Sequence, residues 1–166
     1  MAYLLDANTL IQAKNEYYAF NLCPGFWDWL DQQNAAGNVF SVQAVKEELE
    51  RGNDQLAQWA RDRDTGFFLP VDDRTSGAMA AVSGWVQAGD FREDAKRIFL
   101  AGADPWLIAH ASARGHTVVT HEVHVDGEKR KVKIPTVCRA LNVPCIRTFE
   151  MLHTERARFV LGGEKK

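Results

Sequence analysis

Short apolar runs alternate with longer amphipathic stretches along this chain. Five runs have the length and composition of buried strands, and they cover residues 3–5, 39–42, 67–69, 117–120 and 145–148. The stretches between them carry apolar residues at helical spacing. Because alternating strands and helices fold into parallel sheets, the pattern predicts an α/β fold with a mainly parallel central sheet flanked by helices.

Three of the helical stretches end at a glycine and have a clear apolar face. The faces consist of Phe26, Trp27 and Leu30 before Gly37, of Met79, Val82 and Val86 before Gly89, and of Phe91, Ala95, Ile98 and Phe99 before Gly102. We expect these faces to build the core. Residues 123–132 differ, because an Asp-Gly pair stands between alternating residues, and this pattern predicts a projecting β-hairpin.

The composition indicates one globular domain. The chain has 166 residues, of which 46% are apolar and 25% are charged. No linker or internal repeat divides it, so we expect a single domain over residues 1–161 and a disordered tail at residues 162–166. Because the formal net charge is only −2, any contact with nucleic acid must come from a local basic patch.

Cysteine usage and hydropathy bear on the compartment. Cys23, Cys138 and Cys145 include no CxxC pair, so the sequence indicates neither a disulfide framework nor a thiolate zinc site. The first residues do not form an export signal, and no stretch approaches the roughly 20 apolar residues that cross a bilayer. We therefore expect a soluble, cytoplasmic protein.

Asp6 and Asn8 directly follow the first predicted strand. In an open parallel sheet, ligands bind at the carboxyl ends of the strands, so this position favours a functional role. The alternative is structural: Asn8 caps a helix that starts at Thr9, and Asp6 stabilises the positive end of that helix.

Glu48 follows the second predicted strand in a helical segment with a stripe of Val42, Val45 and Leu49. At about 100° per residue, Glu48 borders this stripe, whereas Glu47 points away from it. Glu48 is therefore the better candidate for a buried site, and Glu47 for a solvated charge. A single glutamate on a helix is more often a surface residue than a ligand.

Two further carboxylates occupy comparable places. Asp104 precedes Pro105 at the start of a predicted helix, where it would be the N-cap, and capping does not prevent its second oxygen from binding a metal. Glu122 follows the fourth strand and should lie at the same edge of the sheet as Asp6.

The negative charge of several carboxylates at one edge of the sheet must be compensated. Two negative charges about 5 Å apart repel by roughly 3 kcal/mol at an effective dielectric constant near 20. A divalent cation or raised pKa values would relieve this repulsion. Ligation by oxygen alone favours Mg²⁺ or Mn²⁺ over zinc, which prefers histidine or cysteine.

These residues and their surroundings resemble PIN-like nucleases, particularly the short bacterial toxins of toxin–antitoxin pairs. The resemblance covers most of the chain and rests on residues 4–8, Glu48-Leu49, residues 103–111 and residues 118–122. Residues 4–11, 24–29 and 134–138 are similar to a PIN-like subgroup other than the best-studied toxins.

The resemblance implies a three-layer PIN-like fold and a metal-dependent endoribonuclease that cleaves RNA with a metal-activated water. It implies that Asp6, Glu48 and Asp104 are the principal ligands of Mg²⁺ or Mn²⁺ and that Glu122 is the fourth acid. Asn8 and Thr120 would support them through hydrogen bonds. Glu122 departs from the family pattern, which more often has aspartate, so the resemblance leaves the number of metal ions open. It also implies an antitoxin protein as partner.

Two other functions are weighed against the nuclease. One is a PIN-like RNA-binding or scaffold module without turnover, which would need an incomplete metal site. The other is a phosphatase of the haloacid dehalogenase type, which also begins with aspartate after its first strand. That chemistry needs a second aspartate two residues later, where this chain has Asn8.

Other segments could bind partners. The basic run of Lys129, Arg130, Lys131 and Lys133 lies close to Glu122 and either binds the RNA backbone or forms a solvated turn. The aromatic residues between positions 17 and 29 favour core packing, with a few left for an antitoxin or homodimer surface. His121 and His124 flank Glu122 without a compact metal-binding spacing, which makes a histidine-rich metal site the weaker alternative.

Overall fold

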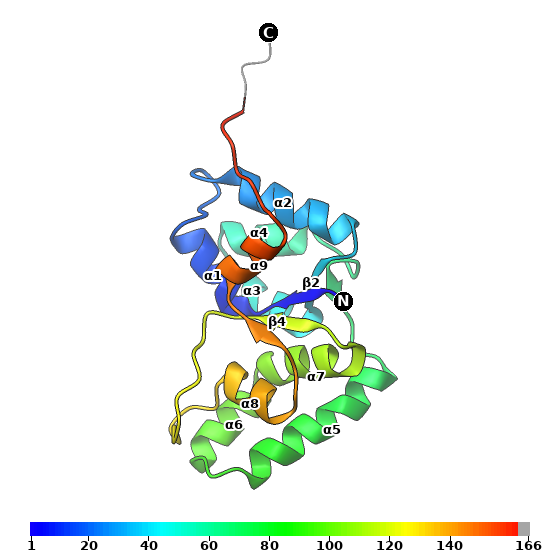
Figure 1. Ribbon diagram of the computed structural model, residues 1–166, viewed down its shortest axis with the longest axis vertical. Coiled ribbons are helices and arrows are strands. Elements are labelled where there is room, and N and C mark those ends of the chain that lie inside the picture. The colour runs from blue at the N-terminus through cyan, green and yellow to red at the C-terminus, as the bar shows by residue number, and fades with distance from the viewer. Residues whose placement is uncertain (163–166) are drawn as a thin grey trace.

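Five short strands form one parallel sheet in the order β3-β2-β1-β4-β5 (Figure 1). The computed structural model describes residues 1–162. The strands are β1 Tyr3–Leu5, β2 Val39–Val42, β3 Phe68–Leu69, β4 Thr117–Val119 and β5 Cys145–Ile146. All five lie within the segments predicted from the sequence. β4 and β5 stop earlier than predicted, and Thr148 already belongs to the next helix.

The centre of the sheet is β1, which is paired on both sides. Tyr3 aligns with Val39 of β2 and with Thr117 of β4. Leu4 and Leu5 are completely buried. A strand with apolar residues pointing in both directions is typical of a parallel sheet covered on both faces.

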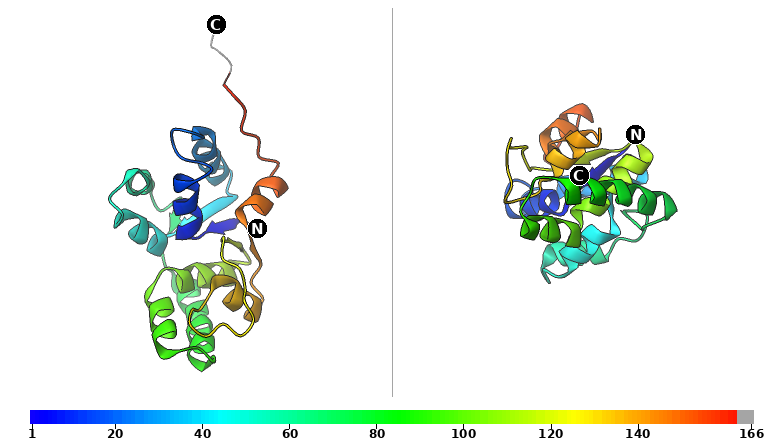
Figure 2. Two further views of the ribbon diagram at one scale, coloured as in Figure 1. Left: turned by 90° about the vertical axis from the view of Figure 1, so that its left-hand side faces the viewer. Right: turned by 90° about the horizontal axis from the view of Figure 1, so that it is seen from below.

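Helices cover both faces of the sheet. Within residues 1–162 they are α1 Ala7–Asn15, α2 Pro24–Ala35, α3 Gln43–Glu50, α4 Gln55–Arg61, α5 Asp73–Ala88, α6 Glu93–Ala101, α7 Asp104–Arg114, α8 Ile134–Ala140 and α9 Thr148–Thr154. Figures 1 and 2 show α1, α2, α4 and α9 on one side and α5, α6, α7 and α8 on the other. Right-handed crossovers require this change of side, because the strand order reverses at β1. The α/β architecture predicted from the sequence is confirmed.

The predicted apolar faces are largely buried. Phe26, Trp27, Val82 and Val86 belong to one cluster of buried apolar side chains. Ile98 is the exception, because 69% of its surface is exposed. Ala95 and Phe99 are four residues apart on α6 and point to the core together. Ile98 lies roughly 80° around the helix from the middle of that pair, so its assignment to the core was wrong.

The predicted β-hairpin over residues 123–132 is also wrong. Asp126 and Gly127 do form a turn, with Gly127 at a φ of 73°, but no strands flank it. Residues 121–133 instead form an irregular loop between β4 and α8. The main-chain N–H of Arg92 donates a 2.9 Å hydrogen bond to the carbonyl of Lys129, which ties this loop to the start of α6.

Two expectations from the sequence concern membrane-spanning segments and the C-terminal tail. No helix within residues 1–162 is both long and apolar enough to cross a membrane. Of the tail expected to be disordered, residues 163–166 lie outside the described residues.

Helix α7 is anchored in the core, which can be tested by shortening one of its buried side chains. We expect Leu107→Ala to destabilise the protein by about 2–5 kcal/mol, because Leu107 is completely buried on α7. The exposed Ile98 is the matched control, and Ile98→Ala should change stability by less than about 0.5 kcal/mol. Urea denaturation measures both. A loss above 2 kcal/mol for Ile98→Ala would contradict its exposure.

A buried histidine on the same helix predicts how stability depends on pH. Burial, followed by the positive charge of Arg114, lowers the pKa of His110 from 6.5 to about 4. Its Nδ1 lies 3.3 Å from the Thr75 hydroxyl, and its Nε2 has no partner within residues 1–162. Between about pH 6.5 and pH 4 the unfolded chain binds a proton here and the folded chain does not.

His110 therefore reduces stability as the pH falls through that window. We expect the wild type to lose more unfolding free energy between pH 7 and pH 5 than His110→Asn, which does not titrate there. Denaturant melts of both proteins at the two pH values measure the difference. Equal losses would show that His110 is protonated in the folded state.

Candidate functional site

The candidate site lies where the strand order reverses. β1 and β4 are neighbours and parallel, with Leu5 aligned to Val119, so the residues after both strands meet at one edge of the sheet. Asp6 follows β1, and Thr120 and Glu122 follow β4. Crevices at such a reversal are where open α/β sheets bind ligands.

Asp6 is completely buried and joins three segments. It is the N-cap of α1: its Oδ1 accepts a 2.7 Å hydrogen bond from the N–H of Thr9, and its Oδ2 accepts one of 2.6 Å from the Thr120 hydroxyl. The alternative in which Asn8 caps a helix starting at Thr9 is wrong. Burial raises the pKa of Asp6 in spite of these hydrogen bonds, which lower it.

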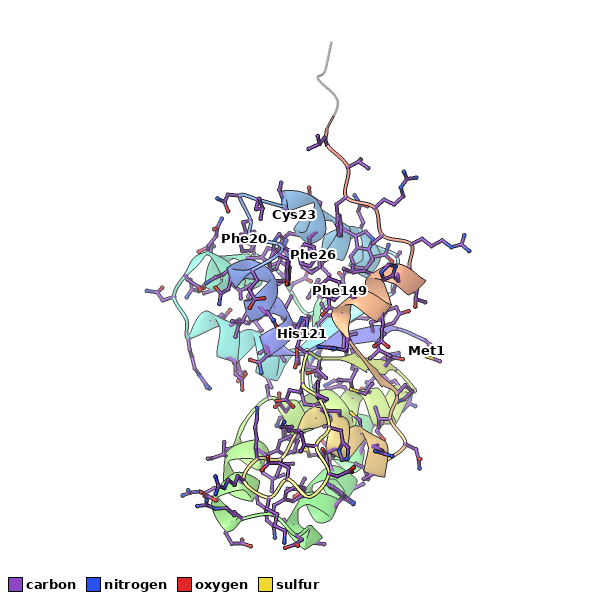
Figure 3. The ribbon with its side chains drawn as sticks, turned by 60° about the vertical axis from the view of Figure 1, so that its left-hand side comes forward. Met1, Phe20, Cys23, Phe26, His121 and Phe149 are labelled. Carbon is purple, nitrogen blue, oxygen red and sulfur yellow. The ribbon has the colours of Figure 1, made fainter. Side chains whose placement is uncertain are left out.

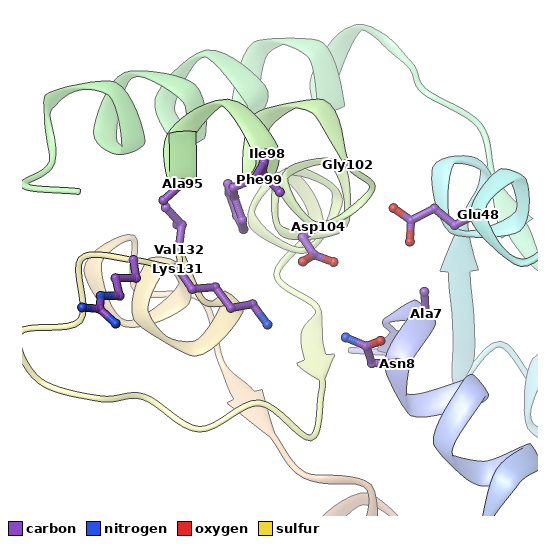
Figure 4. Close-up of a pocket in the computed structure, with 11 residues that line it drawn as sticks. Ala7, Asn8, Glu48, Ala95, Ile98, Phe99, Gly102, Asp104, Lys131 and Val132 are labelled. Atoms are coloured by element: carbon purple, nitrogen blue, oxygen red, sulfur yellow. The ribbon is translucent and has the colours of Figure 1, made fainter. Parts of the chain in front are cut away.

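Asp104 is the first residue of α7, whereas the sequence predicted it to be the N-cap that precedes the helix. Ala103 is the cap residue, and within residues 1–162 the Asp104 carboxylate accepts no hydrogen bond. Burial raises its pKa to about 7, and the negative charges of Asp6, Glu122 and Glu48 add to this rise. Capping therefore does not explain Asp104, whose carboxylate is directed into a pocket (Figure 4).

Glu48 faces the same pocket from α3. It is half-buried, and its Oε1 accepts a 3.1 Å hydrogen bond from the N–H of Ala103, directly before Asp104. Figure 4 shows the Glu48 and Asp104 carboxylates on facing sides of the pocket. Glu47 is exposed and points away, as its helical phase predicted. The structure thus brings these two carboxylates together from elements far apart in the chain.

Glu122 lies at the edge of the site, and both of its oxygens have partners. Oε1 accepts a 2.9 Å hydrogen bond from Lys131 Nζ, and Oε2 accepts one of 2.7 Å from the N–H of Ile134. Its side chain is only 9% exposed. Glu122 therefore ties the irregular loop to the first turn of α8 and holds one lysine of the basic run beside the acids.

The pocket between these elements has a volume of about 430 Å³. Asn8, Glu48 and Asp104 line it, and the amide of Asn8 points into it (Figure 4). The expected hydrogen bonds from Asn8 to the acids are not present, whereas Thr120 does support Asp6. The other residues that line the pocket are Ala7, Ala95, Ile98, Phe99, Gly102, Arg130, Lys131 and Val132.

The donor set of the site suits a hard cation. The negative charges of Asp6, Glu48 and Glu122 are close enough to raise the pKa of Asp104, and oxygen ligands are those that Mg²⁺ and Mn²⁺ prefer. Within residues 1–162, however, no three His, Cys, Asp or Glu side chains lie close enough to hold one ion together. Asp104, which has no hydrogen-bond partner in this part of the chain, is the residue with a free carboxylate for a cation.

The basic run separates in three dimensions. Lys129 forms a 2.6 Å ion pair with Asp90 and lies outside the pocket, whereas Arg130 and Lys131 line it. Lys133 is half-buried at the N-cap of α8. The four residues therefore do not form one uniform patch.

The histidines near Glu122 have other partners. His121 Nε2 lies 3.0 Å from the Thr148 hydroxyl, and His124 bonds both Thr136 and Asp126. Neither lines the acidic pocket. The geometry within residues 1–162 gives no support to a histidine-rich metal site.

The aromatic stretch is mainly core, as its density predicted. Phe26, Trp27 and Trp29 are buried, while Tyr17 is exposed. Figure 3 shows Phe20 and Phe26 in the layer of α1 and α2, away from His121 near the sheet. These rings therefore stabilise the helical layer and do not line the acidic pocket.

Sequence reasoning missed two sets of residues. Thr9 is completely buried, and its N–H binds Asp6; the Asp-x-x-Thr spacing of an N-capped helix could have revealed it. The apolar lining from Ile98, Phe99 and Val132 had no local pattern, because it joins α6 to a loop more than 30 residues later.

Known proteins provide two comparisons with this chain. A chain of VapBC2 from Rickettsia felis, solved with a DNA fragment from their promoter, matches with a TM-score of 0.54 and 15% sequence identity. The match covers 89% of this chain and 98% of that chain, and it confirms the predicted PIN-like α/β fold. A search of curated proteins found no match. The family described as "Domain of unknown function (DUF4411)" matches residues 3–159, and the chain belongs to that family.

Proposed function

We propose that this protein is a metal-dependent endoribonuclease. The observation that carries the proposal is the Asp104 carboxylate, which within residues 1–162 faces the pocket without a hydrogen bond while three other carboxylates lie near it. Burial and these neighbouring negative charges favour a proton or a cation on the carboxylate. Its place at the reversal of the strand order, beside two basic side chains, favours a phosphate-containing substrate.

Glu48 and Asp104, which line the pocket, would hold Mg²⁺ or Mn²⁺, and Asp6 would join them if the three carboxylates drew closer on binding than they stand within residues 1–162. The ion would activate a water and polarise the phosphate that is cut. The chain's own residues orient these ligands. Thr9 and Thr120 fix Asp6, and each Asp6 oxygen keeps a lone pair beyond the bond it accepts. The N–H of Ala103 fixes Glu48.

A partner protein is part of the proposal. The sequence resembles toxins of toxin–antitoxin pairs, and the fold matches a chain of the VapBC2 complex. We infer that this chain is the toxin of a type II pair, that its antitoxin is a protein, and that its substrate is RNA. A homodimer fits the exposed Tyr17 and Leu22 beside α2.

A second candidate is an RNA-binding module without turnover. It is favoured by one observation, that within residues 1–162 no three acidic or histidine side chains are arranged to hold an ion. Mn²⁺ titration followed by a cleavage assay separates the two functions.

The first functional prediction concerns Asp104. We expect Asp104→Asn to reduce Mn²⁺-dependent RNA cleavage at least 100-fold, because the carboxylate that faces the pocket is lost while its shape is kept. Glu47→Gln removes an exposed carboxylate beside Glu48 and is the matched control, with activity unchanged. Cleavage of a labelled RNA and thermal melting measure both variants.

Two outcomes contradict this assignment. Full activity of a folded Asp104→Asn protein would remove Asp104 from the metal site. A wild type that binds Mn²⁺ and RNA without cleaving a broad pool of RNA would favour the binding module.

Glu122 acts through Lys131 in this proposal, because its Oε1 already pairs with the Lys131 ammonium. It places the Lys131 ammonium beside the acids, where this cation can contact the phosphate (Figure 4). Glu122 is thus a positioning residue in this proposal. The sequence instead predicted a fourth metal ligand, and an experiment can distinguish the two roles.

We expect Glu122→Gln and Lys131→Met each to raise the KM for RNA several-fold and to leave Mn²⁺ affinity within about twofold. The double variant should be no worse than Lys131→Met, because the two residues act on one contact. Lys131→Met should also lower the salt slope of RNA binding by about 1. A tenfold loss of Mn²⁺ affinity in Glu122→Gln would instead identify Glu122 as a metal ligand.

A further inference from the structure

The acidic pocket has a second, chemically different end. Glu48 and Asp104 face each other on one side, whereas Ala95 and Phe99 of α6 and Val132 of the loop form an apolar wall on the other (Figure 4). The two ends belong to one cavity of about 430 Å³, which is a common size for a small-ligand site. Metal binding by itself does not need the apolar wall.

Ile98 extends this wall to the surface. It is 69% exposed although it lies on a helix whose neighbouring positions Ala95 and Phe99 are buried. Phe99 and Val132 are almost fully buried, so Ile98 is the accessible apolar group at this end of the pocket. Its exposure leaves an aliphatic surface on which a flat, apolar molecule can pack.

Two basic residues of the loop, Arg130 and Lys131, line the same pocket. Lys131 Nζ bonds Glu122 and points toward the acidic end. The Arg130 side chain lines the pocket and forms no ion pair within residues 1–162. Its main chain is fixed by a 2.7 Å hydrogen bond from its N–H to Glu128. Arg130 therefore has a planar cation available for a ligand.

We propose that the apolar end is a subsite for one nucleobase of the RNA, adjacent to the phosphate that is cut. This inference rests on the proposed nuclease function and adds a group that holds the nucleotide next to the phosphate that is cut. A nucleotide joins a charged phosphate to a flat base with apolar faces, and the pocket joins a charged end to an apolar end in the same way.

Recognition would depend on the faces of the base more than on its edges. The wall from Ile98, Phe99 and Val132 has no side-chain donor or acceptor, and the Arg130 guanidinium can stack over a base from the other side. Every base has such faces, so the subsite accepts any base. Purines bind better than pyrimidines because they cover more apolar surface.

The test measures binding without cleavage. Asp104→Asn protein is titrated into a short RNA of pyrimidines that carries one 2-aminopurine, whose fluorescence rises when the base leaves its stacked neighbours. We expect this rise on binding, because the base packs on the aliphatic Ile98. Introducing Ile98→Ser into the same protein should remove the rise and weaken binding roughly 5- to 30-fold, because the base no longer buries an aliphatic side chain.

The control removes another exposed aliphatic group elsewhere. Val71 is 46% exposed and lies outside the pocket, so introducing Val71→Ser should leave the fluorescence rise and the affinity unchanged. An RNA that is abasic at the 2-aminopurine position should bind the Asp104→Asn protein as weakly as the intact RNA binds the Ile98→Ser form. The Ile98→Ser form should bind the abasic RNA no more weakly than it binds the intact RNA.

Either of two results would overturn the subsite: no fluorescence rise on binding, or a rise that survives Ile98→Ser. Both are independent of catalysis, because the wild type is assayed separately for Mn²⁺-dependent cleavage of the same RNA. Cleavage without base stacking refutes the subsite alone. Stacking without cleavage refutes the nuclease alone.

Discussion

The arrangement of this protein depends on how one buried carboxylate is satisfied. Asp6 has no exposed surface, and its two oxygens bind the N–H of Thr9 and the hydroxyl of Thr120. These two bonds join the end of β1, the first turn of α1 and the end of β4. A buried carboxylate without such partners would cost several kcal/mol, so the three segments are held together where the strand order reverses.

The same constraint determines the electrostatics of the pocket. Because Asp6 is fixed in place, Asp104 and Glu48 approach a negative charge that cannot turn toward water. Burial and this charge raise the pKa of Asp104 to about 7. The chain supplies one compensating cation itself, Lys131, held by Glu122 at the end of the loop. In the proposed function, a divalent metal compensates the remaining negative charge of the carboxylates and of the bound phosphate.

The pocket also combines two layers of the molecule that have different physical properties. Its acidic end comes from the edge of the sheet, where parallel strands end and helices begin. Its apolar end comes from α6, which the loop contacts through the bond between Arg92 and Lys129. In the proposed function, these two ends would hold a base and its adjoining phosphate.

The sequence by itself determined the sheet, its flanking helices and which acids follow which strands, because strand and helix periodicities are local. Helical phase also placed Glu48, and not Glu47, at the pocket. Only the tertiary structure decided that Asp104 is free of capping, that Glu122 binds Lys131, and that Ile98 lines a pocket instead of the core. These outcomes depend on contacts between residues far apart in the chain, and local patterns carry no information about such distances.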